Sequence, residues 1–230
     1  MRKIYVNGCS FSFHPDAGFP MYSEIIGDHY KIDYINRAWP GSCNRRIIRT
    51  TLRDSLDLPP GSLAIIQLTF LGRTEKVYSG HPDSAWKMLP DSAQEEYHES
   101  IKLVDSSDPD ENAYMSFWLR YFDEPAELTD LASQIIMLTG HLKSRGIDYF
   151  IYPHLALADQ SAVNCVSDDR LMKEISQDPK IFNFLGPGLA DIMDNEDFYH
   201  DGPKRHFNAA GHQKAADWLL DKINQLYGPE

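Results

Sequence analysis

The sequence predicts an α/β domain with a mainly parallel sheet, because short apolar runs of strand length alternate with segments of helical periodicity. Strands are expected within residues 4–6, 31–36 and 63–70. Helices are expected between them, at 20–29 and 44–56. Strands that alternate with helices are typical of parallel sheets, whose strands are covered on both faces.

Each of these elements ends at residues that interrupt regular structure. Ile4-Tyr5-Val6 is a short apolar run closed by Asn7-Gly8, which suits a buried central strand. The first helix ends at Gly27-Asp28. Pro59-Pro60-Gly61 stops the second helix before the apolar run 63–70, which has the length of a buried strand.

Residues 71–125 lose this pattern and become polar, aromatic and acidic, which indicates an insertion or lid. A structureless loop of this length is uncommon in a compact domain. We therefore expect a largely helical insertion, with helices around 92–103 and 113–121.

Regular periodicity returns after the insertion. An amphipathic helix is predicted at 128–144, a fourth strand at 147–153 and a closing helix at 209–227. With 230 residues and 42% hydrophobic content, the chain can bury one sizeable core, so we expect a single domain over 1–230.

Charge and cysteine content narrow the function classes. A net charge of −12 argues against a nucleic-acid partner, because proteins that bind phosphate backbones use clusters of Lys and Arg. Cys9, Cys43 and Cys165 show no CxxC spacing, which predicts neither disulfides nor zinc and fits a reducing compartment. The N-terminal apolar run is too short for a signal peptide or a membrane span, so we expect a cytoplasmic protein with no membrane partner.

Candidate chemistry lies where the predicted strands end. Ligands of open α/β sheets bind outside the carboxyl ends of the strands, where the Ser10 turn, the Gly41 turn and Thr69 are expected. Gly41 precedes a predicted helix, whose free amides favour negative charge. A hydroxyl at Ser10 and an imidazole at His206 are a nucleophile and a base if the fold brings them together.

The sequence also offers two alternatives, a cysteine nucleophile and a metal site. Cys9 is a stronger nucleophile than Ser10 when its pKa is lowered, but beside a buried strand we expect it to pack as a small apolar residue. His200, Asp201, His206 and His212 invite a metal hypothesis, although their spacing matches no ligand motif. We expect no metal and no cofactor.

Three segments together resemble the SGNH/GDSL hydrolase family. They are Gly8-Cys9-Ser10, the run 39–44 that contains Pro40-Gly41, and the run 206–212 that begins with His206. The resemblance implies a flavodoxin-like three-layer α/β/α sandwich. It also implies that Ser10 attacks an ester carbonyl, that His206 takes its proton, that an upstream aspartate orients the imidazole, and that the amides of Ser10 and Gly41 bind the oxyanion.

The sequence departs from the family pattern in three places. Cys9 stands where the family has the aspartate of Gly-Asp-Ser. Pro203 stands where the family has the acid before the histidine, so Asp201 is the expected substitute, Asp197 is a weaker candidate, and a Ser-His dyad is the remaining alternative.

The third departure follows the third strand, where the chain reads Gln67-Leu68-Thr69-Phe70-Leu71-Gly72-Arg73 in place of the family's oxyanion asparagine. Thr69 is the expected replacement donor, with Gln67 and Asn44 behind it, because a hydroxyl or an amide can donate where an apolar side chain cannot. Arg73 is expected near a polar group of the substrate.

Two functions follow. The first is a serine esterase or deacylase that cleaves a small ester, such as an acetylated sugar. The alternative is a non-hydrolytic member of the family, a ligand-binding module or a transferase of an acyl or other group, which the altered third motif and Pro203 suggest.

Overall fold

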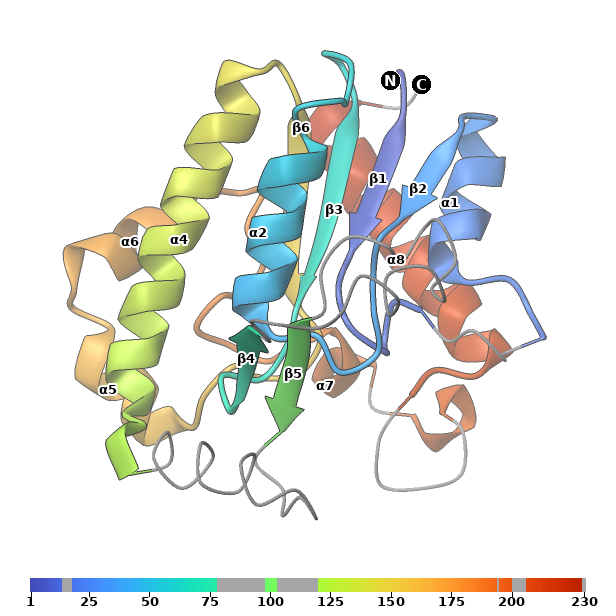
Figure 1. Ribbon diagram of the computed structural model, residues 1–230. Coiled ribbons are helices and arrows are strands. Elements are labelled where there is room, and N and C mark those ends of the chain that lie inside the picture. Colours follow the sequence, from blue (N-terminus) through green and yellow to red (C-terminus); the bar gives the residue numbers. More distant parts are fainter. Residues whose placement is uncertain (14–17, 78–97, 103–119, 194, 200–205, 229–230) are drawn as a thin grey trace.

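The centre of the molecule is a parallel sheet of four strands in the order β2-β1-β3-β6 (Figure 1). The computed structural model describes residues 1–13, 18–77, 98–102, 120–193, 195–199 and 206–228. The strands are β1 (Ile4–Asn7), β2 (Tyr34–Asn36), β3 (Leu63–Leu68) and β6 (Asp148–Pro153). Ile4 pairs with Tyr34 on one side and with Leu63 on the other.

Helices cover both faces of the sheet, which makes three layers (Figure 1). On one face lie α2 (Asn44–Asp54) and α4 (Glu124–Ser144), with α5 (Gln160–Val166) and α6 (Arg170–Gln177) against α4. On the other face lie α1 (Tyr22–Tyr30) and α8 (Ala209–Tyr227). The predicted α/β/α sandwich with a parallel sheet is confirmed.

Alternation of side chains along the strands explains the two cores. Successive residues of a strand point to opposite faces, so a continuously apolar strand supplies both layers. In β3, Ala64, Ile66 and Leu68 join the core under α2 and α4, whereas Leu63 and Ile65 join the core under α1 and α8. All six residues of β3 are buried.

Most helix boundaries lie within a few residues of those that the sequence predicts. α1 runs past the predicted stop at Gly27-Asp28 and ends at Tyr30, because the left-handed conformation that closes it is taken by Lys31, with φ of 55°. α4 begins four residues earlier than the amphipathic pattern predicts, because Pro125 is well suited to the first turn of a helix. α8 spans Ala209–Tyr227 as predicted and is capped by Asn208, whose side chain accepts from the Gly211 amide. In the ranges that the structure describes, no helix is long and apolar enough to cross a membrane.

The insertion differs from the expectation of a largely helical segment. β4 (Arg73–Val77) and β5 (His98–Lys102) form an antiparallel pair in which Arg73 lies opposite Lys102. The helix predicted over 92–103 is therefore wrong at 98–102, because pairing with β4 overrides the local pattern there. Of the helix predicted at 113–121, residues 120 and 121 are helical and the rest lies outside the described residues. The pair lies beyond the carboxyl ends of the central strands (Figure 1). A short helix, α7 (Leu189–Ile192), comes between α6 and α8 in the chain.

Candidate active site

Ser10 lies in a tight turn directly after β1. The Ser12 amide donates to the Cys9 carbonyl at 2.9 Å, which places Ser10 at the second position of a four-residue turn. Cys9 is fully buried, whereas Ser10 is partly exposed. The turn therefore directs the Cys9 thiol into the core and leaves the Ser10 hydroxyl at the surface of the site.

Asn7 fixes the start of this turn. Its side-chain oxygen accepts from the Gly8 amide at 2.9 Å. Its nitrogen donates into α2, to the Ile47 carbonyl at 3.0 Å and to the hydroxyls of Thr50 and Thr51 at 2.8 and 2.9 Å. A buried amide with partners on both ends ties the end of β1 to the first turns of α2.

Gln67 holds the turn from the neighbouring strand. Its side-chain oxygen accepts from the Ser12 hydroxyl at 2.6 Å and from the Cys9 amide at 3.4 Å. Its nitrogen donates to the Leu68 carbonyl at 2.7 Å, which fixes the orientation of the carboxamide because a carbonyl can only accept. We expected Gln67 as a reserve oxyanion donor, and the structure shows its amide committed to the Ser10 turn.

A tyrosine continues this buried network behind Ser10. The Tyr22 hydroxyl lies 2.6 Å from the Ser12 hydroxyl and donates to it, because Ser12 uses its own proton toward Gln67. Burial raises the pKa of Tyr22 to about 12, although its hydrogen bond to Ser12 acts in the opposite direction. The phenol is therefore neutral at physiological pH and serves as a fixed donor.

The Gly41 turn is joined to the Ser10 turn by backbone. The Ser42 amide donates to the Trp39 carbonyl at 3.1 Å, and Gly41 has φ of 83° at the third position of this turn, after Pro40. This is the type II arrangement, which requires positive φ and so favours glycine. The Trp39 amide also donates to the Gly8 carbonyl at 3.1 Å.

Two backbone amides remain available at these turns. The Ser10 and Gly41 amides donate no hydrogen bond within the described ranges of the chain. Buried amides normally find partners, and free ones at a site are suited to bind a negatively charged oxygen.

His206 is positioned by the residues that follow it. Phe207 is buried, pairs with Tyr199 across an isolated bridge and stacks on its ring at 5.5 Å. Asn208 caps α8 and also donates to the carbonyls of Asp197 and Tyr199 at 2.8 and 3.1 Å. The imidazole therefore projects from a fixed point at the start of α8.

The turn after β1 and the start of α8 bring Ser10 and His206 together. The Ser10 hydroxyl oxygen lies 2.9 Å from Nε2 of His206, 196 residues away in sequence. Phe11 supports this pair, with its ring 4.8 Å from the His206 ring and stacked at 3.8 Å on buried His154. Nε2 can accept the hydroxyl proton when Nδ1 carries the ring proton.

Asn44 and Thr69 form a reciprocal pair at the end of β3. The Asn44 side chain donates to the Thr69 carbonyl and accepts from the Thr69 amide, both at 2.8 Å. The Thr69 hydroxyl accepts from Nη1 of Arg73 at 2.9 Å. Both side chains, which we expected as oxyanion donors, thus shape the loop that carries Arg73.

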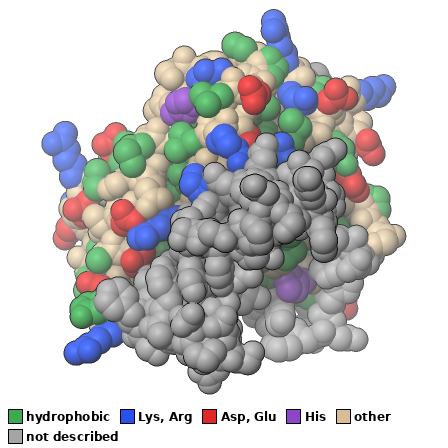
Figure 2. Space-filling view, viewed as in Figure 1, with side chains coloured by type: hydrophobic (Ala, Val, Ile, Leu, Met, Phe, Trp, Pro, Cys, Tyr) green, Lys and Arg blue, Asp and Glu red, His purple; other side chains and the backbone are tan. Residues whose placement is uncertain are grey.

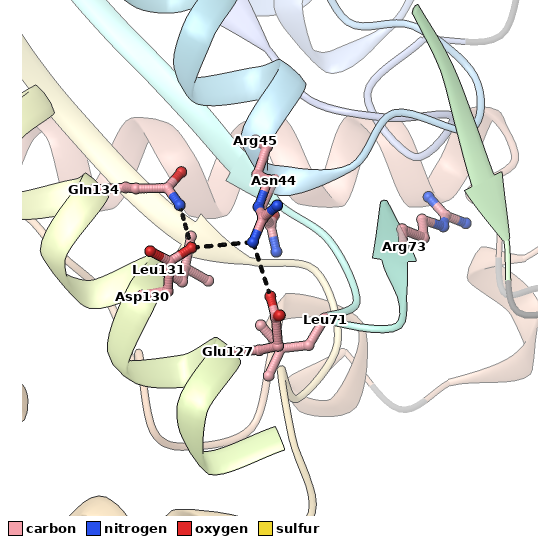
Figure 3. Close-up of a pocket in the computed structure, with 8 residues that line it drawn as sticks. All are labelled: Asn44, Arg45, Leu71, Arg73, Glu127, Asp130, Leu131 and Gln134. Atoms are coloured by element: carbon pink, nitrogen blue, oxygen red, sulfur yellow. Dashed lines mark hydrogen bonds and ion pairs between the residues drawn. The ribbon is translucent and has the colours of Figure 1, made fainter. Parts of the chain in front are cut away.

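A small pocket lies beside this loop, between α2, α4 and β4. In Figure 3, Arg45 reaches toward Glu127 and Asp130, at 3.6 and 3.4 Å, while Arg73 lies at the opposite side. Burial raises the pKa of the Glu127 carboxyl, and the Arg45 charge opposes this shift. Figure 2 shows further Lys and Arg side chains gathered over α2, which carries Arg45, Arg46, Arg49 and Arg53.

Of the two aspartates expected as candidates to orient His206, the structure describes only Asp197. Asp201 lies outside the described residues, as does His200. Asp197, the weaker candidate, is exposed in a short 3-10 helix, Glu196–Phe198, and its amide donates to Asn195.

Several residues of the site escaped the sequence analysis. Asn7, Ser12, Tyr22 and His154 are buried polar residues around the turn. His154 directly follows β6, so its place at a carboxyl strand end was the available signal. The roles of Ser12 and Tyr22 had no such signal, because their partners come from other parts of the chain.

Comparison with solved structures relates the fold to known proteins. The crystal structure of YxiM from Bacillus subtilis has a TM-score of 0.53 at 13% identity, over 98% of this chain and 56% of that one. A protein from Desulfitobacterium hafniense, assigned to the lipolytic G-D-S-L family, has a TM-score of 0.53 at 13% identity, over 96% of this chain and 99% of that one. This chain therefore spans little more than half the length of YxiM.

The chain therefore shares its fold with YxiM and with the protein of the G-D-S-L family. No protein-family profile matches the sequence, and no curated protein matches it.

Proposed function

We propose that this chain is a divergent SGNH/GDSL serine hydrolase, an esterase or deacylase that cleaves a small carboxylic ester. The observation that carries this proposal is the 2.9 Å separation between the Ser10 hydroxyl and His206 Nε2. That contact is what a nucleophile and its general base require. The shared fold supports the same function, as do the amides of Ser10 and Gly41, which donate no hydrogen bond within the described ranges.

In the proposed reaction, Ser10 Oγ attacks the ester carbonyl while His206 Nε2 takes its proton. The amides of Ser10 and Gly41 stabilise the oxyanion, and such donors are each worth roughly 3–4 kcal/mol of transition-state stabilisation. His206 then gives its proton to the leaving alkoxide, which leaves an acyl group on Ser10. A water molecule, deprotonated by His206, then attacks the acyl carbonyl; the bond from the acyl carbon to Ser10 Oγ breaks, the acid leaves, and His206 returns the proton to Ser10 Oγ.

Asp201 is proposed to hold the proton of His206 on Nδ1, with a Ser-His dyad as the alternative. Thr69 and Asn44 are proposed to support the oxyanion site through the loop that they hold. We also propose that the protein acts in the cytoplasm as one domain over residues 1–230, with residues 71–125 as a lid. Its three cysteines are free, which fits a reducing compartment.

The test is turnover of p-nitrophenyl acetate together with labelling of Ser10 by a fluorophosphonate. Ser10→Ala and His206→Gln should each lower kcat/KM by at least about 10³-fold, because the nucleophile and its base act together and neither works without the other. Labelling should disappear in Ser10→Ala. A folded wild-type protein that neither turns over esters nor takes the label would overturn the proposal.

The altered third motif favours a second candidate, a ligand-binding module or acyl transferase of the same fold. Leu71 and Arg73 occupy a segment where the family has its oxyanion asparagine. An acyl label that forms on Ser10 and passes to an added alcohol faster than to water would identify the transferase.

A further inference from the structure

Arg73 is held in place by the protein through one end of its guanidinium. Nη1 donates to the Thr69 hydroxyl at 2.9 Å and to the Ser42 carbonyl at 3.3 Å. The guanidinium carbon lies 4.7 Å from the centre of the Phe70 ring, within the range of a cation–π contact. Because Thr69 is itself fixed by Asn44, the position and plane of the guanidinium are set before any ligand binds.

The other edge of the same group, formed by Nε and Nη2, makes no hydrogen bond or ion pair within the part of the chain that the structure describes. Arg45, in the same pocket, is instead neutralised by Glu127 and Asp130. In Figure 3 the Arg73 guanidinium points away from those two acids.

The edge formed by Nε and Nη2 has a defined chemical preference. Nε–H and Nη2–H of a guanidinium are parallel donors whose spacing matches the two oxygens of a carboxylate. A carboxylate monoanion is neutralised by one guanidinium, whereas neutralising a phosphate dianion needs a second positive charge.

Arg73 is connected to the reacting pair through the Gly41 turn and through two aromatic rings. Ser42, whose carbonyl it contacts, directly follows Gly41, the candidate oxyanion donor. Phe70 lies under its guanidinium and packs edge-on against Phe11 at 6.0 Å, and Phe11 lies 4.8 Å from the His206 ring. The two rings therefore form a chain of contacts that joins Arg73 to His206.

We propose that Arg73 is a specificity-determining residue that binds a carboxylate of the substrate, so that the preferred substrates are esters that carry a carboxylate apart from the scissile bond. This inference rests on the proposed hydrolase function. It adds the substrate class, which neither the Ser10-His206 pair nor the fold defines.

The experiment compares matched substrates that differ in one charge. Acetyl esters of glycolate, 3-hydroxypropanoate and 4-hydroxybutanoate place the carboxylate one, two and three carbons from the ester oxygen. Their primary amides are the neutral counterparts. For at least one length, wild-type kcat/KM should be about 10- to 100-fold higher for the acid, the range expected for hydrogen bonds to a charged group.

Variants assign that preference to Arg73. Arg73→Gln should remove the preference for the acid, so that the ratio of kcat/KM for the acid to kcat/KM for the amide falls to about 1. Arg73→Lys keeps the charge but lacks the paired donors, so it should keep only part of the preference. Arg170→Gln, an equal charge change on exposed α6, is the matched control and should behave as wild type. Equal turnover of acids and amides by the wild type, or a preference that survives Arg73→Gln, would overturn the inference.

A binding measurement separates this inference from the proposed hydrolase function. If no ester is cleaved, the hydrolase proposal fails, and thermal unfolding with 4-hydroxybutanoate or its amide still tests Arg73. The acid should raise the unfolding temperature of wild type and Arg170→Gln, but not of Arg73→Gln. No difference between acid and amide in the wild type would then overturn the Arg73 inference as well.

Discussion

The side-chain oxygen of Gln67 lies 2.6 Å from the hydroxyl oxygen of Ser12, two residues after the candidate nucleophile. This bond joins the end of β3 to the turn that carries Ser10. Both residues are fully buried, so their hydrogen bonds replace contacts that water would otherwise provide. The geometry of the nucleophile thus depends on a residue that is remote in sequence.

Replacing Gln67 by Leu removes the acceptor for Ser12 and for the Cys9 amide. We expect a loss of about 1–3 kcal/mol in the free energy of unfolding, the cost of leaving a buried donor unpaired. Urea denaturation measures this loss. The double variant with Ser12→Ala should lose less than the sum of the two single variants, because the first change already breaks their shared bond. Additive losses would contradict the proposed coupling.

Gly8→Ala should disrupt the same turn by steric contact. An added Cβ would lie 2.6 Å from the Ser12 hydroxyl and 2.8 Å from the Gln67 side-chain oxygen. We expect lower stability and a lower rate of esterase turnover. Gly140→Ala is the control, because nothing lies within 4 Å of its Cβ in α4 and alanine favours a helix by roughly 1 kcal/mol. The two variants should therefore shift the thermal unfolding midpoint in opposite directions.

The cysteines should differ sharply in reactivity. Cys165 is exposed on α5, whereas Cys9 and Cys43 are buried. A thiol reagent should therefore rapidly modify one thiol per folded chain. Cys165→Ser should abolish this rapid modification without affecting ester turnover. Rapid modification of Cys9 in the Cys165→Ser protein, with loss of activity, would instead identify Cys9 as the nucleophile.

Asp178 should make stability depend on pH in the acid range. Burial acts to raise the pKa of this carboxyl, but hydrogen bonds from the Tyr149 hydroxyl, the Lys180 amide and Lys143 outweigh it and lower the pKa. The unfolded state then binds more protons than the folded state, so this stabilisation is present above the unfolded pKa and is lost as pH falls through the folded pKa. Asp178→Asn should flatten the fall in stability between about pH 5 and pH 3. An unchanged acid profile would contradict this assignment.

Local sequence patterns were sufficient to predict most of the fold. Continuous apolar runs predict buried strands because both faces of a parallel strand are covered, and β3 shows this along its whole length. The insertion was misjudged at 98–102 because the pairing of β5 with β4 is a contact between segments about 25 residues apart. Such pairing is decided by tertiary structure and leaves little local signal.

The sequence by itself determined the α/β layering, the glycine at position 41 and the chemical types at Ser10 and His206. These depend on periodicity, on a turn that needs positive φ, and on side-chain chemistry, all of which are local properties. Only the tertiary structure decided that Gln67 supports a turn, that Asn44 holds Thr69, and that Arg73 contacts Thr69 and Ser42 through Nη1 alone among the described residues. An amide or a guanidinium carries several donors, and which of them are used depends on neighbours that folding brings from distant parts of the chain.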